Sequence, residues 1–419
     1  MRMRRAVINA ALLAVALFVP ASASPQNVAI TNARIIVGSG QVIDSGTIIV
    51  RDGKIAMVMG GSTQIPRGLQ VIDATGMSAM PGFIDGHKHL ADGPTGKAWM
   101  QSLLEAGYTT VLIGGGAADA NLSLAKKIES GEYNGPRVIP SGTVALRQTP
   151  LEARIAVQAL AQMGIKHTGE IGLTPEPAPP QAEIEVLKAI VDEAKKVGIQ
   201  VNVHAVSSPA MIAAIDAGVT RLVHLPNKDW TTYEQADAVA QAGAIVAGLI
   251  AFGAPNIDTL SQGPAPVQWP KDNTPRFRDG KAWPEAIVGA NRDAQGRATG
   301  TEGGFTIINA RRIWDADPSH TTISYSTDQN ADDLVVLEHE LKSFSIVFSM
   351  ADIHRIIGPN AARFVGMADQ IGTLEAGKLA DIILLDGDAT KNIYDMLKTK
   401  VVLKEGRIVV DKRVRSALR

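Results

Sequence analysis

The chain has 419 residues, of which 45% are hydrophobic and 20% charged, and its formal net charge at pH 7 is −1. This composition is typical of a globular protein of one to three domains, and it excludes a disordered or fibrous chain. Because the charge is near zero and no long basic or acidic block is present, we expect no nucleic-acid partner. The absence of cysteine excludes disulfides and thiolate ligands, so any metal must be held by histidine, carboxylate or modified lysine.

Residues 1–23 have the pattern of a secretory signal peptide. Arg2, Arg4 and Arg5 precede an apolar stretch that ends near Pro20, and a small-x-small cleavage site ends at Ala23. The apolar stretch is shorter than the about 20 residues that a membrane-spanning helix needs. We therefore expect a periplasmic or secreted protein with no membrane association after cleavage; a retained membrane anchor is the alternative.

Both ends of the mature chain predict short strands joined by tight turns. Near the N-terminus these strands are residues 28–36, 46–51 and 54–58, and near the C-terminus they are 380–385, 401–404 and 407–410. Asp52-Gly53 and Glu405-Gly406 lie between such strands, and Asp-Gly between β-rich runs is a strong hairpin signal. We expect residues 24–79 and 367–419 to form one small β-sandwich domain from both termini.

Between residues 80 and 366, β-type and helix-type segments alternate. Strands are predicted for the run that ends at His89 and for 109–113, 137–140, 164–171, 200–204, 221–224, 244–250 and 321–326. Helices are predicted for 151–163, 182–197, 209–217 and 233–242. About eight strands with helices between most of them indicate an α/β fold, specifically a (β/α)8 TIM-like barrel; a doubly wound open sheet is the alternative.

One segment of this region, residues 252–319, breaks the alternation. It is rich in Gly, Pro, Asn and Asp, and it contains Trp269, Trp283 and Trp314, three of the five tryptophans. A structureless connection of this length is unusual in a compact domain. We interpret it as an insertion that covers the active site or forms a contact in a homo-oligomer.

Polar residues stand where several predicted strands end. The first strand ends in His87-Lys88-His89, and alternation along a strand directs both histidine side chains to one face. Later strands end near Glu170, His204, His224 and Asp328. Each residue alone has an ordinary structural explanation. Catalytic residues of a parallel barrel lie at the carboxyl ends of its strands, so their shared position predicts one site.

Imidazole and carboxylate are typical ligands of zinc and related divalent ions. Six ligands are too many for one tetrahedral ion but suit two ions, most simply zinc, that share a bridge. We assign one ion to His87, His89 and Asp328 and the other to His204 and His224, with Glu170 as the bridge. Coordination lowers the pKa of water to about 7 and so supplies hydroxide, and Asp328 would act as general acid/base. The sequence thus predicts metal-assisted hydrolysis of a small molecule.

These motifs resemble those of the amidohydrolase superfamily. His87-x-His89 resembles its first strand, the spacing from His204 to His224 its fifth and sixth strands, and Ser326-Thr327-Asp328 its eighth-strand aspartate. The segment 377–381 is similar to its returning β-sandwich. The resemblance covers nearly all of the mature chain. It implies a distorted barrel, one or two metal ions and hydrolysis of a C–N bond in an amide, a cyclic amide or a peptide-like substrate.

The fourth strand leaves two candidates for the bridging ligand. Many binuclear members use a carboxylated lysine, a role that Lys166 could take, and others use a glutamate. Gly169-Glu170-Ile171-Gly172 is most similar to the imidazolonepropionase/enamidase-like branch, so we favour Glu170.

Two other functions remain as alternatives. A mononuclear deaminase of the same superfamily would usually lack a bridge on the fourth strand, and Glu170 argues against it. A non-catalytic scaffold on the same fold would have no reason to retain six matched ligands.

Overall fold

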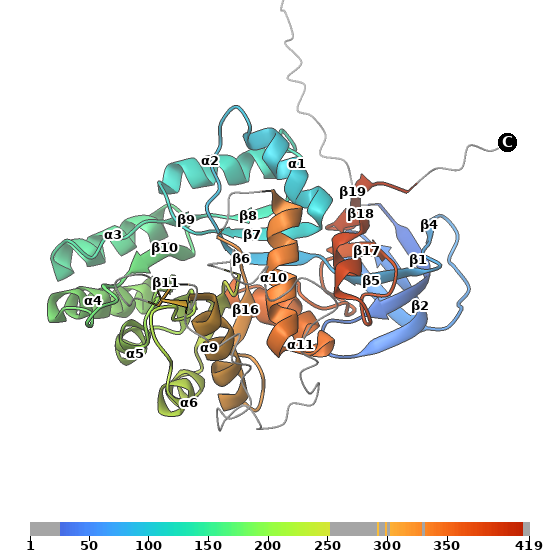
Figure 1. The fold of residues 1–419 in the computed structure, drawn as a ribbon. Helices are drawn as coiled ribbons and strands as arrows, with labels where there is room; N and C mark the ends of the chain where they lie inside the picture. The colour runs from blue at the N-terminus through green and yellow to red at the C-terminus, as the bar shows by residue number, and fades with distance from the viewer. Residues whose placement is uncertain (1–25, 252–290, 293–297, 300–301, 329–331, 414–419) are drawn as a thin grey trace, which may run out of the picture.

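The computed structural model describes residues 26–251, 291–292, 298–299, 302–328 and 332–413. These residues form an α/β fold with parallel sheets and a separate β-rich part, which confirms the sequence-based prediction at this level. Figure 1 shows the first and last strands side by side at one end of the molecule, next to the region of alternating strands and helices. The predicted domain boundaries stay a prediction.

The β-rich part is one sheet that uses both ends of the chain. Its eight strands follow the order β19-β18-β17-β5-β1-β2-β3, with β4 paired to β1. Their bounds are β1 (Val28–Ile36), β2 (Val42–Arg51), β3 (Lys54–Gly60), β4 (Gln70–Asp73), β5 (Met77–Pro81), β17 (Ile382–Asp386), β18 (Thr399–Lys404) and β19 (Arg407–Asp411). The pairing of β17 with β5 joins the two ends of the chain.

Two tight turns explain why the predicted hairpins form. Asp52 and Gly53 connect β2 to β3 with φ angles of 50° and 80°, and Glu405 and Gly406 connect β18 to β19 with φ angles of 49° and 71°. Two successive residues with positive φ match the right-handed twist of paired strands, and glycine adopts this conformation without strain.

Strand β17 of this sheet is buried on both faces. In β17, Ile382 and Leu384 pack in the core of the terminal sheet, whereas Ile383 and Leu385 pack in the core of the barrel region. Side chains of a strand point alternately to opposite faces, so a continuous apolar run serves two cores. The terminal sheet is thereby joined to the region of parallel strands by a shared apolar interface.

The parallel strands lie in two sheets rather than in one closed ladder. One has the order β6-β7-β8 and the other β16-β13-β12-β11-β10-β9. Their bounds are β6 (Phe83–Lys88), β7 (Tyr108–Ile113), β8 (Arg137–Ile139), β9 (Ser141–Gly142), β10 (His167–Gly172), β11 (Gln200–His204), β12 (Arg221–Val223), β13 (Ile245–Gly248) and β16 (Ile323–Tyr325). The sequence predicted a closed barrel, but no closed ladder is found among the described residues. Pro140, which has no amide hydrogen, separates β8 from β9.

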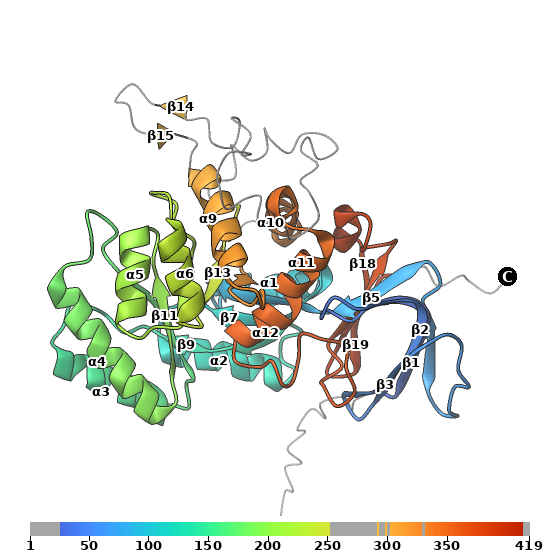
Figure 2. The ribbon, with the colours of Figure 1, turned by 90° about the horizontal axis from the view of Figure 1, so that it is seen from below.

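Helices follow most of the parallel strands and cover the outer surface of the sheets (Figures 1 and 2). They are α1 (Gly96–Ala106), α2 (Ala118–Glu129), α3 (Pro150–Gln162), α4 (Gln181–Val197), α5 (Ser208–Asp216), α6 (Tyr233–Gln241), α9 (Glu302–Ala316), α10 (Asp333–Val347), α11 (Met350–Arg355) and α12 (Ala361–Phe364), with short turns η3 (Ile356–Asn360) and η4 (Ile393–Leu397). Capping boxes at Thr149 and Thr232 begin α3 and α6.

Part of the segment that was predicted to be a structureless insertion is a helix. Residues 302–316 of the predicted range 252–319 form α9, and Trp314 on this helix is fully buried in the barrel core. Helix α9 therefore belongs to the regular alternation, because it follows β13 and precedes β16. Trp269 and Trp283, and with them the predicted cover or oligomer contact, lie outside the described residues. Two short strands, β14 (Asn291–Arg292) and β15 (Ala298–Thr299), pair with each other.

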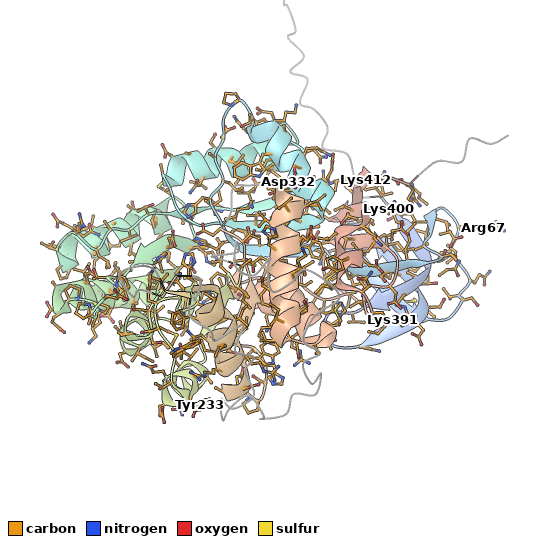
Figure 3. The ribbon with its side chains drawn as sticks, viewed as in Figure 1. Arg67, Tyr233, Asp332, Lys391, Lys400 and Lys412 are labelled. Atoms are coloured by element: carbon orange, nitrogen blue, oxygen red, sulfur yellow. The ribbon has the colours of Figure 1, made fainter. Side chains whose placement is uncertain are left out.

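Charged side chains such as Arg67, Lys391 and Lys412 are exposed at the periphery of the molecule (Figure 3). Within the described ranges, the helices are all too short or too polar to cross a lipid bilayer.

Gly82 is the only residue between β5 and β6 and so connects the terminal sheet to the first parallel strand. A Cβ atom on it would overlap the buried side chain of Thr109. We expect Gly82→Ala to lower the free energy of unfolding by about 1–3 kcal/mol, as for other overpacked cores. Gly60→Ala is the control, because its Cβ would meet only Ile43, at 3.5 Å. Equal thermal midpoints for the two variants would contradict this account.

Candidate metal centre

The six predicted ligands converge at the carboxyl ends of five parallel strands. His87 lies in β6 and His89 directly follows it, Glu170 lies in β10, and His204 is the last residue of β11. His224 and Asp328 follow β12 and β16. Parallel strands place their carboxyl ends at the same edge, so residues far apart in the sequence meet there. The structure brings all six residues into one cluster.

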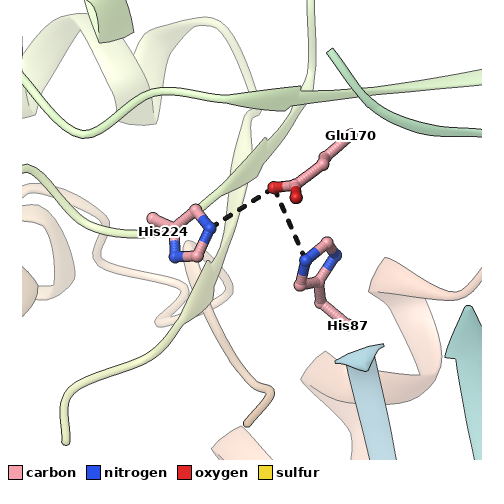
Figure 4. Close-up of side chains that lie close together, drawn as sticks. All are labelled: His87, Glu170 and His224. Carbon is pink, nitrogen blue, oxygen red and sulfur yellow. Dashed lines mark ion pairs between the residues drawn. The ribbon is translucent and has the colours of Figure 1, made fainter. Parts of the chain in front are cut away.

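Glu170 occupies the middle of this cluster. Its Oε1 lies 3.1 Å from His89 Nε2, and its Oε2 lies 2.8 Å from His204 Nδ1. Oε2 is also 3.4 Å from His224 Nε2 and 3.5 Å from His87 Nε2 (Figure 4). One carboxylate is therefore shared by four imidazoles.

Asp328, which follows β16, approaches the same cluster. Its Oδ1 lies 3.3 Å from His89 Nε2 and 3.5 Å from His87 Nε2, and its Oδ2 lies 3.8 Å from His224 Nε2. In the described chain, two groups have ligand atoms close enough to hold one ion: His87, His89 and Asp328, and His87, Glu170 and His224. His87 belongs to both groups, whereas our sequence-based assignment placed it with one ion.

Several separations within the cluster, those of Asp328 above all, fit a metal ion. Ligand atoms around one tetrahedral zinc, at bond lengths of about 2.0–2.2 Å, lie about 3.3–3.6 Å from one another. The distances from Asp328 Oδ1 to His89 and His87, 3.3 and 3.5 Å, are of this size and are too long for good hydrogen bonds. His87 Nε2 is buried and has no hydrogen-bond partner among the described residues. A buried nitrogen that faces two carboxylates without such a bond is suited to coordinate a cation.

The electrostatics favour an ionised Glu170. Burial raises the pKa of this carboxyl, but the hydrogen bonds from His204 and His89 and the close imidazole of His224 outweigh burial and hold the pKa well below its usual range. The bond to Glu170 raises the pKa of His89, and burial lowers the pKa of His224. Glu170 is therefore an anion at neutral pH, the form in which a carboxylate binds metal.

Two residues of the cluster have an unusual backbone conformation. His224 and Asp328 have φ angles of 68° and 50°, a left-handed region that non-glycine residues rarely adopt. Each turns the chain at the point where a parallel strand has ended. Such strain occurs at functional sites when the surrounding structure enforces it.

Lys166 and the other histidines in the described chain stand apart from the cluster. Lys166 is exposed and precedes the first residue of β10, at the opposite end of the strand from Glu170. His354 is buried in α11 and lies 3.0 Å from the carbonyl of Ala389. His320 stacks on Trp314 with ring centroids 4.7 Å apart. His167, at the start of β10, contacts the carbonyl of Val365.

The loop after His224 is held by a residue that the sequence did not single out. Asn309 on α9 is fully buried, and its amide donates to the carbonyls of Pro226 and Asp229 while its oxygen accepts from Thr231 N. Trp230 in this loop packs edge-on against Phe305, with ring centroids 4.2 Å apart. The loop that follows His224 is thus fixed to helix α9.

A second residue missed by the sequence analysis is Asp85. It is fully buried beneath the histidine pair and accepts hydrogen bonds from His87 N and from Thr327, the neighbour of Asp328. The signal that could have found it is strand alternation, because Asp85 lies two residues before His87 and so on the same face of β6.

The comparisons with known proteins agree with this geometry. The Amidohydrolase family matches residues 78–246 and 304–409, which include all six residues of the cluster. The chain belongs to the amidohydrolase family and, with it, to the metal-dependent hydrolases that act on C–N bonds.

Individual relatives are distant. The chain is 24% identical over 413 residues to an imidazolonepropionase of Geobacillus sp. (strain WCH70), an alignment that covers 88% of this chain and 91% of the relative. Shorter matches cover 45% of an enamidase of Eubacterium barkeri, at 28% identity and 39% of this chain, and 25% of an S-triazine hydrolase of Gordonia rubripertincta, at 38% identity and 23% of this chain.

Solved structures share the fold. A putative prolidase from Bifidobacterium longum superposes with a TM-score of 0.73 at 22% identity, covering 93% of this chain and 97% of that one. A Xaa-Pro dipeptidase with bound methionine gives 0.71 at 20% identity, covering 91% and 99%. Together with the family match, these neighbours imply a TIM-barrel fold with a separate domain.

Proposed function

We propose that the chain is a two-metal hydrolase that cleaves an amide-type C–N bond, with two divalent ions, most simply zinc, held by the six clustered residues. The observation that carries the proposal is the position of Glu170, whose Oε1 faces His89 and whose Oε2 faces His204, His224 and, at 3.5 Å, His87. A carboxylate with its two oxygens directed to different histidines is suited to bridge two ions. Lys166, exposed at the far end of β10, is not.

The ligands divide between two positions around this bridge. His87, His89 and Asp328 would hold one ion, and His204 and His224 the other. The ions would act as Lewis acids that polarise the substrate carbonyl and make water nucleophilic near neutral pH. Glu170 supplies one negative charge between the two positions and keeps the four imidazoles oriented towards them.

Asp328 is the proposed general acid/base. Its side chain is 15% exposed, and its Oδ1 faces His87 and His89. Hydrolysis forms a bond between the oxygen of water and the carbonyl carbon and breaks the C–N bond. Asp328 would accept the proton that this water loses and donate it to the leaving nitrogen, so that it ends the cycle ionised as it began.

The proposed substrates are small amides, cyclic amides or peptide-like compounds. Support comes from the names of the relatives, an imidazolonepropionase and an enamidase, and from the prolidase and dipeptidase among the structural neighbours. A screen of dipeptides and cyclic amides with metal-loaded protein tests this. Release of ammonia from amino-substituted heterocycles, with no amide cleaved, would favour the deaminase instead.

We also propose that the parallel strands complete a (β/α)8 barrel and that the terminal sheet corresponds to a β-sandwich. In support, Asp328 N donates to the carbonyl of His87 at 2.9 Å, and this hydrogen bond links the ends of β6 and β16. A crystal structure with these two strands separated by another element would contradict this.

The metal content of protein purified without chelators tests the centre directly. We expect about two divalent ions per chain in the wild type. Glu170→Ala should retain one or fewer because the bridge is lost, whereas Lys166→Ala should retain two. About one ion in the wild type would favour the mononuclear deaminase, and none, with no activity after added zinc, would favour a scaffold. Loss of an ion in Lys166→Ala alone would move the bridge to that residue.

Asp328→Asn separates proton transfer from metal binding. The amide retains the size of the side chain and one oxygen ligand, but it cannot accept a proton at neutral pH. We expect metal content close to that of the wild type and a kcat lower by about 10²–10⁴-fold, the usual contribution of a positioned acid/base. A variant with near-wild-type kcat would show that another group transfers the proton.

Export and assembly are also proposals. Residues 1–23 lie outside the described residues, and their sequence pattern predicts cleavage after Ala23. We expect the protein recovered from the periplasm or the medium to begin at Ser24, as Edman sequencing would show. An intact Met1 in the mature protein would contradict export.

Light scattering of the same sample would test the proposed homo-oligomer.

A further inference from the structure

Three of the six ligands lie at the ends of β6 and β16, on opposite sides of a gap in the sheet. β6 carries His87 and leads into His89, whereas β16 leads into Asp328, and no ladder joins β6 to β16 among the described residues. Yet the carboxylate of Asp328 lies within 3.5 Å of both histidines. Some interaction other than a regular ladder must hold this register.

Asp85 makes that connection. Its Oδ1 accepts from the backbone amides of His87 and Thr327, each at 3.1 Å, and its Oδ2 accepts from the hydroxyl of Thr327 at 2.6 Å. The carboxylate therefore bonds to both sides of the gap at once. Asp85 and Thr327 are fully buried, so water does not compete for these bonds.

Lys88 completes the arrangement from the other side of the hydroxyl. Its Nζ donates to Thr327 Oγ1 at 3.2 Å and lies 3.4 Å from Asp333 Oδ1. The hydroxyl thus accepts from Lys88 and donates to Asp85, which uses both of its hydrogen-bonding capacities. Asp333, at the start of α10, also accepts from Trp99 and Ser102 on α1. Lys88 therefore joins the Thr327 hydroxyl to the carboxylate of Asp333.

The connection acts on the most strained part of the site. Asp328 has a φ of 50°, and its own amide donates to the carbonyl of His87 at 2.9 Å. The preceding residue, Thr327, is held through both its amide and its hydroxyl by Asp85. The direction of the Asp328 side chain is therefore set from both sides relative to the histidine pair.

We propose that Asp85 is a positioning residue, which through Thr327 sets the distance between the Asp328 carboxylate and His87 and His89 across the gap between β6 and β16. The inference rests on the proposed metal centre. Asp85 touches neither substrate nor ion; its effect passes through the backbone of His87 and through Thr327. Partners of this kind contribute about 10–100-fold to metal affinity or activity.

Thr327→Val tests the proposal, because valine has nearly the shape of threonine but lacks the hydroxyl that joins Asp85 to Lys88. The probe is Co²⁺, added to chelator-treated full-length protein and followed by its visible absorption and by equilibrium dialysis. We expect one of two cobalt equivalents to bind about tenfold or more weakly than in the wild type, with an altered spectrum, and the other to bind nearly unchanged. We also expect kcat to fall about 10–100-fold and KM to change little.

Two variants control for the loss of a buried hydroxyl. Thr327→Ser retains the hydroxyl and should restore both the cobalt spectrum and kcat. Thr322 lies one residue before the start of β16, and its buried hydroxyl donates to the carbonyl of Ile313 at 3.1 Å. Thr322→Val removes this hydroxyl. It should lower the thermal midpoint about as much as Thr327→Val while leaving cobalt affinity and kcat unchanged.

The outcomes separate this inference from the proposed function. Wild-type protein that binds no cobalt would overturn the metal centre itself. Wild-type protein that binds two equivalents, with a Thr327→Val variant of equal affinity, spectrum and kcat, would overturn only the positioning role of Asp85. The same would follow if Thr322→Val and Thr327→Val weakened cobalt binding equally, because the effect would then be a general loss of stability.

Discussion

The interaction on which the site depends is the attraction between one partly buried carboxylate and four imidazoles. Glu170 lies within 3.5 Å of a nitrogen of His87, His89, His204 and His224. Four imidazole nitrogens this close to one carboxylate are suited to share a cation. The parallel arrangement of the strands makes this cluster possible, because aligned strand ends bring five separate segments to one point.

Much of the site could be predicted because its logic is local. A ligand at a strand end is visible as a polar residue after an apolar run, and the hairpin turns at Asp52-Gly53 and Glu405-Gly406 depend on a few neighbouring residues. The strand β1 and the helices α3 to α6 also agree with the predicted ranges to within a few residues. In each case hydrophobic periodicity and turn chemistry act within a short window.

What the sequence did not reveal depends on distant contacts. The run that ends at His89 reads as one strand, but Gly82 divides it into β5 and β6 because its two halves pair with different sheets. Helix α9 is obscured by the Gly- and Pro-rich residues before it, and its role becomes clear only from the buried Trp314. The hydrogen bond between Asp85 and Thr327 joins residues that are 242 positions apart in the sequence, and the residues around neither of them predict it.

The terminal sheet also has a consequence for the order in which the chain can fold. β17 lies between β18 and β5, so the sheet begun by β1 to β5 is complete only when residue 411 has been synthesised. The edge of β5 that pairs with β17 therefore has no partner while some 300 further residues are translated. Contacts of such long range form slowly. The strands that are synthesised first are therefore among the last to gain all their neighbours, and the terminal sheet can close only when nearly the whole chain is available.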